Sequence, residues 1–247
     1  MSFQKEYYQQ MKDLLNMIEE TQESNINESA TAICESIING GVFHVLDTGH
    51  MLMYEGVGRS GGLMLVRPLR VSVEVENPVR KRSRTSQKVA FMDEIEGLPD
   101  YILDKGNVEP GDVLMIGSVS GVKTLPVGLA LAAKKRKVTT IAITSIVYSS
   151  SLCSMHPSGK KLFEITDYVL DNCSPEGDAL VYVKSLGLSI CPGSGIGAAY
   201  VMWSLQSRIV EILLEKGINP SIYKSHYLDG ASIHNQKSWE RHESSGF

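Results

Sequence analysis

The chain has 247 residues, and its 28 Asp and Glu outnumber its 24 Lys and Arg to give a formal net charge of −4. A chain of this length buries the core of one domain, while the acidic balance gives no overall attraction to nucleic acid or to an anionic membrane surface. No uncharged apolar segment reaches the roughly 20 residues that cross a bilayer. We expect no signal peptide, because no basic segment followed by an apolar one opens the sequence.

Four cysteines are spread along the sequence without forming a CxxC pair: Cys34, Cys153, Cys173 and Cys191. This spacing argues against a zinc ribbon or a thioredoxin-like motif and is typical of free thiols in a reducing compartment. We therefore expect a soluble cytoplasmic protein that binds neither nucleic acid nor membranes.

Apolar residues at helical spacing predict two helices at the start of the chain. The first spans residues 3–21 and the second spans residues 26–37, because Asn25 and Asn27 interrupt the pattern between them. Asn39-Gly40-Gly41 is a stop signal that ends the second helix.

A polar glycine turn follows the first predicted strand. Residues 42–46 form this strand and lead into Asp47-Thr48-Gly49-His50, and ligands of open α/β sheets collect at such strand ends. Residues 51–65 are predicted to be helical, although four glycines each cost the helix about 1 kcal/mol relative to alanine. Residues 69–75 alternate in polarity and predict the next strand.

A basic run, Arg80-Lys81-Arg82-Ser83-Arg84 with Lys88, comes after that strand. Its composition favours a solvated, mobile loop, with a phosphate-attracting lid as the alternative. Nucleic-acid binding is disfavoured because the whole chain is acidic and no aromatic residues interleave the basic ones.

The centre of the chain has the pattern of strand, polar turn, helix and strand, which predicts a right-handed βαβ crossover in a parallel sheet. The strands are residues 113–116 and 138–143, and the helix is residues 125–137. Ser118-Val119-Ser120-Gly121 forms the turn, where hydroxyls, main-chain N–H groups and the positive end of a helix can together hold a phosphate. The alternative is an ordinary turn whose serines only cap the helix.

The last part of the chain adds a polar loop at 149–157, short strands at 168–170 and 179–183, and a long helix at 194–216. The glycines before this helix resemble a dinucleotide-binding loop. An NAD site is disfavoured, because no clean strand leads into them and no acidic residue occupies the usual ribose position. The tail carries polar side chains that suit ligand contact or are incidental, namely His226, Asp229, His234 and Asn235.

Taken in order, these motifs resemble the sugar isomerase (SIS) domain family, and within it a bacterial branch related to phosphoheptose isomerases. The segments that carry the resemblance are 45–50, 59–62, 110–114, 118–121, 141–145, 156–160, 171–173, 228–230 and 234–235. It implies a three-layer, doubly wound α/β fold with a five-stranded parallel sheet over residues 40–247. Residues 1–39 are then an N-terminal helical segment that packs on the domain or on a partner subunit.

The resemblance also implies a phosphorylated sugar at the carboxyl ends of the strands, in a homodimer or homotetramer whose sites a neighbouring subunit completes. The serines of the turn would hold the phosphate. Lys123 stands where the general family pattern has threonine, so it either strengthens anion binding or blocks the site. The candidate residues for phosphate and sugar binding are Thr48, Gly49, Ser118, Ser120, Gly121, Lys123, Thr124, Asp229 and Asn235.

Aldose–ketose isomerisation needs a base that moves a proton between adjacent carbons through an enediol, and donors that stabilise the developing oxyanion. Glu55 is the candidate base, with an exposed helical glutamate as the alternative. His50 or His234 would protonate the sugar oxygen, unless each is a structural histidine. The sequence therefore favours a phosphosugar isomerase that uses no cofactor and no metal, and the alternative is a non-catalytic sugar-phosphate-binding sensor or partner protein.

Overall fold

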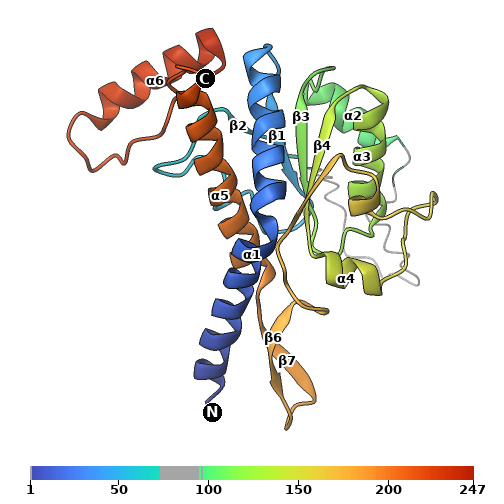
Figure 1. Cartoon of the computed structure of the whole chain (residues 1–247). Coiled ribbons are helices and arrows are strands. Elements are labelled where there is room, and N and C mark those ends of the chain that lie inside the picture. Colours follow the sequence, from blue (N-terminus) through green and yellow to red (C-terminus); the bar gives the residue numbers. More distant parts are fainter. Residues whose placement is uncertain (1, 73–94, 96) are drawn as a thin grey trace, which may run out of the picture.

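A five-stranded parallel sheet forms the centre of the structure, a computed structural model that describes residues 2–72, 95 and 97–247 (Figure 1). The strands in spatial order are β2 (Val66–Pro68), β1 (Phe43–Asp47), β3 (Val113–Gly117), β4 (Thr139–Thr144) and β5 (Tyr168–Asp171). Each neighbouring pair is parallel, so the predicted sheet is confirmed. The strand expected at 69–75 is wrong in its described part, because β2 ends at Pro68 and residues 69–72 belong to no strand; residues 73–75 and the basic run at 80–88 lie outside the described residues.

Helices cover both faces of this sheet and complete the predicted three layers. On one face lie α1 (Phe3–Ile38) and α5 (Ser194–Glu215), and on the other lie α2 (Leu98–Lys105) and α3 (Thr124–Lys135). Side chains of a strand alternate between faces, so Met115 of β3 packs in the core with α1 and α5 while Leu114 and Ile116 pack in the core with α2 and α3.

The N-terminal helix is continuous, and the prediction of two separate helices is wrong. Neither asparagine breaks α1, because an asparagine in a helix interior costs only about 0.7 kcal/mol, whereas the flanking Ile18, Ile26 and Ile33 are buried against the sheet and α5. The side chain of Asn25 stays within the helix and donates to Gln22 Oε1 at 3.1 Å.

The helix predicted at 51–65 is also wrong, since these residues form a series of turns that leads into β2. Gly58 and Gly61 have φ values of +68° and +86°, which no helix accommodates. Gly56 and Gly62 lie directly against α5: a Cβ on Gly56 would be 2.9 Å from Met202 Cγ, and one on Gly62 would be 3.2 Å from the ring of Trp203. The apolar residues of this segment are buried by packing on α5, without any helical period of their own.

Four further elements depart from the expected pattern or extend it. α4 (Ile146–Ser151) is a short helix that overlaps the start of the loop expected at 149–157. The expected strand β6 (Ala179–Val183) pairs antiparallel with an unexpected strand, β7 (Leu188–Pro192), in a hairpin separate from the main sheet. The C-terminal tail forms α6 (Ala231–Ser245). No helix in the described part of the chain is both long and apolar enough to cross a membrane.

The larger of the two cores lies between α1, α5 and the sheet, and the smaller lies beneath α2 and α3. The packing of the larger core predicts different effects on stability at two residues of α1. Ile33 is fully buried, whereas Met17 on the same helix has half of its surface exposed. Replacing Ile33 by alanine leaves a cavity between α1, α5 and the sheet and should lower the free energy of unfolding by about 2–5 kcal/mol. Urea denaturation measures this loss, and Met17→Ala, as the matched control, should change stability by less than about 0.5 kcal/mol. Equal effects of the two substitutions would contradict the observed packing of α1.

Candidate functional site

Two loops meet at the carboxyl edge of the sheet where the strand order reverses, between β1 and β3. In a doubly wound sheet of the order 2-1-3-4-5 this is the position at which ligands bind. A cavity of about 350 Å³, here called the β1–β3 cavity, opens between these loops. Its lining residues are Asp47, Thr48, Gly49, Met51, Ser118, Val119, Ser120, Lys123, Tyr148, Gly177 and Asp178.

The turn from β3 to α3 is held rigidly from behind by β4 and the residues after it. Ser118 N donates to Ile143 O at 3.0 Å, and Val119 O accepts from Ser145 N and from Thr144 Oγ1, both at 3.0 Å. Gly121 has a φ of +59°, and a Cβ added there would lie 3.0 Å from Thr144 Oγ1. Both the backbone conformation and the limited space therefore favour glycine at this position.

The turn from β3 to α3 is rich in hydrogen-bond donors. Ser118 is almost buried, and its Oγ accepts only a long bond from Gly121 N at 3.3 Å, which leaves its hydroxyl proton for another acceptor. The hydroxyl of Ser120 is partly exposed. The N–H groups of Ser120, Lys123 and Thr124 have no acceptor among the described residues, and no side chain caps α3. This helix start therefore presents free donors together with the positive end of the helix dipole.

The carboxylates around the cavity are already occupied by N–H groups of the chain. Asp47 accepts from Gly49 N at 2.9 Å and Leu52 N at 2.7 Å, and Asp178 accepts from Ser194 N at 2.7 Å and Ser194 Oγ at 2.8 Å. Main-chain N–H groups and one hydroxyl therefore hold both carboxylates. The part of the cavity suited to an anion is then the turn at residues 118–121, here called the serine turn.

The carboxylate at the end of β5 also accepts hydrogen bonds from main-chain N–H groups, although it does not line the cavity. Asp171 Oδ1 accepts from Cys173 N at 2.9 Å and Ile146 N at 3.2 Å. Burial raises the pKa of the Asp171 carboxyl. Burial, together with the charge of Asp171, also raises the pKa of the Cys173 thiol to about 11, so this thiol is protonated at neutral pH.

The structure brings five of the sequence-predicted binding residues together in the lining of the β1–β3 cavity: Thr48, Gly49, Ser118, Ser120 and Lys123. Gly121 shapes the turn, and the hydroxyl of Thr124 donates to Met155 O at 3.3 Å. Thr48 Oγ1 donates to Gly117 O at 3.1 Å, which ties the β1 loop to the end of β3.

The three candidate catalytic residues lie elsewhere within a single chain. Glu55 lines a separate hollow with Trp203, where its carboxylate is 3.3 Å from Arg59 Nε. His50 is exposed in the β1 loop but does not line the β1–β3 cavity. His234 belongs to α6, and its Nε2 lies 3.1 Å from Ile222 O.

The two tail residues predicted to bind substrate also belong to the α6 region. Asn235 holds the main chain of Lys224 through bonds of 2.8 and 2.9 Å, and Asp229 O accepts from Lys224 Nζ. This helix packs at the opposite end of β1, since Trp239 and Phe43 line one hollow there (Figure 1).

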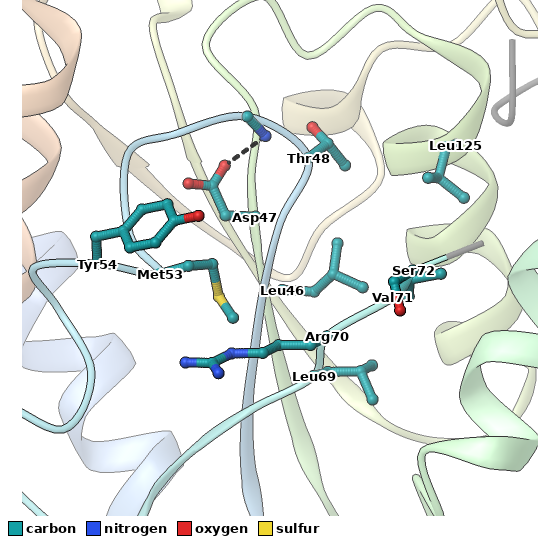
Figure 2. Close-up of a pocket in the computed structure, with 11 residues that line it drawn as sticks. Leu46, Asp47, Thr48, Met53, Tyr54, Leu69, Arg70, Val71, Ser72 and Leu125 are labelled. Carbon is teal, nitrogen blue, oxygen red and sulfur yellow. Dashed lines mark hydrogen bonds between the residues drawn. The ribbon is translucent and has the colours of Figure 1, made fainter. Parts of the chain in front are cut away.

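Sequence reasoning missed three residues around this edge. Tyr148 and Asp178 enter the β1–β3 cavity from α4 and from the start of the hairpin, and Arg70 lines a neighbouring cavity shown in Figure 2. No local signal marks any of them, because each is placed by a connection that follows a different strand. In the described residues no three His, Cys, Asp or Glu side chains are grouped to hold a metal ion.

The conformation of Gly121 predicts that alanine lowers stability at this position but not at Gly195. Gly121→Ala forces a side chain into the left-handed region and against Thr144, which should lower the free energy of unfolding by about 1–3 kcal/mol. The control is Gly195→Ala in the first turn of α5, where no heavy atom lies within 4 Å of the added Cβ. Alanine there should be neutral or stabilise by up to about 1 kcal/mol. Chemical denaturation compares the two variants, and a Gly121→Ala protein of unchanged stability would show that the turn is not constrained as described.

Comparisons with known proteins identify the family of the chain and agree with its fold. The family model of the SIS domain matches residues 6–145. A UPF0309 protein of Oceanobacillus iheyensis is 32% identical over 245 residues and 98% of each chain, and one of Halalkalibacterium halodurans is 34% identical over 226 residues and 91% of each chain. A phosphoheptose isomerase from Francisella tularensis has the same fold, with a TM-score of 0.50 and 14% identity over 85% of this chain and 99% of that one. The chain therefore belongs to the SIS domain family and, within it, to the UPF0309 proteins of bacteria.

Proposed function

We propose that the protein binds a phosphorylated sugar with its phosphate at the turn between β3 and α3. SIS domains bind sugar phosphates. The observation that supports the proposal here is the set of unpaired N–H groups at Ser120, Lys123 and Thr124, next to the hydroxyls of Ser118 and Ser120. Oriented donors at a helix start bind phosphate without a buried cation, and Lys123 at the rim adds a positive charge.

We further propose that the bound sugar phosphate undergoes aldose–ketose isomerisation through an enediol, in the cytoplasm. Glu55 is the proposed base, and His50 or His234 the proposed acid. Within one chain neither Glu55 nor His234 lines the β1–β3 cavity. The proposal therefore includes a homodimer or homotetramer in which a neighbouring copy supplies these groups, together with the contacts of Asp229 and Asn235.

A non-catalytic sugar-phosphate sensor is the second candidate. The hydrogen bonds of the acidic residues favour it. Asp47 and Asp178 in the cavity accept hydrogen bonds from main-chain N–H groups, and Glu55 forms an ion pair with Arg59, so none of the three is an unpaired base. Proton abstraction requires a base within reach of the sugar carbon, most often an imidazole or a carboxylate. A sensor needs only the phosphate-binding turn.

The phosphate site is tested by removing one hydroxyl that makes no hydrogen bond within the described chain. Ser120→Ala takes away one charge-assisted hydrogen bond and should weaken binding of fructose 6-phosphate by about tenfold. Isothermal titration calorimetry measures the dissociation constant, with fructose as the ligand control. The matched variant is Ser207→Ala on the exposed side of α5, which should bind with the affinity of the unaltered protein. Equal affinity of the two variants for fructose 6-phosphate would contradict a phosphate site at this turn.

Catalysis is tested by replacing the proposed base. Glu55→Gln keeps the shape of the side chain and removes its basicity, so turnover of a panel of aldose and ketose phosphates should fall by at least about a hundredfold. Binding of the same compounds, measured by thermal shift, should stay the same. Stabilisation by a sugar phosphate without conversion in the unaltered protein would support the sensor instead. Stabilisation by NAD alone would overturn both functions.

A further inference from the structure

A second cavity adjoins the first at the carboxyl edge of the sheet. This β1–β2 cavity of about 510 Å³ lies between the loop after β1, the segment after β2 and the first turn of α3 (Figure 2). Its size falls within the roughly 300–1,000 Å³ of small-molecule sites. The residues that line it are Leu46, Asp47, Thr48, Gly49, Met53, Tyr54, Leu69, Arg70, Val71, Ser72 and Leu125.

The two cavities have three lining residues in common, so they lie side by side at the loop after β1. Asp47, Thr48 and Gly49 line the β1–β3 cavity and the β1–β2 cavity alike. The start of α3 also touches both, with Lys123 in the first and Leu125 in the second. A sugar ring placed at the β1 loop, with its phosphate at the serine turn, therefore has a second cavity available for a substituent.

The chemistry of the β1–β2 cavity differs from that of the serine turn. Leucine, valine, methionine and tyrosine side chains form most of its lining. Figure 2 shows the guanidinium of Arg70 on the side of Met53, pointing away from Val71 and Leu125. Arg59, Arg136 and Arg208 are each paired with a carboxylate. Arg67 lies over the ring of Trp239, and Arg241 donates to Ser221 Oγ and Pro220 O. Arg70 has neither an ion pair nor a side-chain hydrogen bond among the described residues. Asp47, the acidic residue of this lining, is held by Gly49 N and Leu52 N. An arginine in such a position is suited to bind a carboxylate of the ligand through two parallel hydrogen bonds.

We propose that the β1–β2 cavity binds a substituent of the sugar phosphate, namely a short apolar arm that ends in a carboxylate. The apolar part contacts Leu46, Leu69 and Val71, and the carboxylate pairs with Arg70. The inference rests on the proposed phosphate site, and it narrows the ligand class from sugar phosphates in general to those with a carboxylated side arm.

Three probes of one parent sugar separate the contributions of the arm and its charge: N-acetyl-, N-butyryl- and N-succinylglucosamine 6-phosphate. The butyryl and succinyl arms have the same length, and only the second carries a carboxylate. Titration calorimetry of the full chain should give a dissociation constant about tenfold lower for the succinyl probe than for the butyryl probe. Arg70→Met should reduce this ratio to about one and leave the affinity for the N-acetyl probe unchanged.

Two further variants serve as control and as independent check. Arg208→Met on α5 removes an arginine outside both cavities and should keep the tenfold preference. Ser72→Trp fills the β1–β2 cavity from an exposed position and should weaken the butyryl and succinyl probes more than the acetyl probe. Equal binding of the succinyl and butyryl probes, or a preference that survives Arg70→Met, would overturn the subsite while the phosphate site stands. Failure of fructose 6-phosphate and of all three probes to bind would overturn both the subsite and the phosphate site.

Discussion

Main-chain N–H groups at the ends of the parallel strands need hydrogen-bond acceptors, and aspartate carboxylates supply them around most of the sheet. At the amino edge, Asp112 accepts from Val42 N and Glu109 N, both at 2.8 Å, and Asp167 accepts from Thr140 N at 2.9 Å. At the carboxyl edge, Asp47 does the same for the loop after β1, and Asp171 for the segments after β4 and β5. Each carboxylate thereby fixes one strand end and removes donors that would otherwise need water or a ligand.

The turn after β3 has no such aspartate, and the proposed function depends on this difference. Its own carbonyl groups are tied to β4 and the residues after it, but the donors of Ser120, Lys123 and Thr124 are left without an acceptor among the described residues. An aspartate at this place would satisfy them and repel an anion. Hydroxyls at Ser118 and Ser120 instead keep the turn polar and uncharged, so a phosphate can supply the missing acceptors.

The serine turn could be predicted from the sequence because everything that forms it is contiguous: an apolar run, a polar glycine turn and a helix start. The prediction of a helix at 51–65 is wrong because Gly56 and Gly62 lie directly against Met202 and Trp203, more than 140 positions away, and local sequence spacing carries no information about that packing. Arg70, Tyr148 and Asp178 reach the carboxyl edge only through the strand order, so no local pattern identifies them. The position of Glu55 in a separate hollow likewise depends on turns that replaced the predicted helix.

The continuous first helix has a consequence for the order in which the chain folds. Its buried side packs mainly on α5, and Cys34 Sγ donates to Ile209 O across a sequence separation of 175 residues. Such distant partners impose a high entropic cost on early contact formation. During synthesis α1 leaves the ribosome well before α5 and keeps its apolar stripe exposed until α5 has followed. The larger core therefore closes late, and the smaller core beneath α2 and α3, made from residues much nearer in sequence, can form ahead of it.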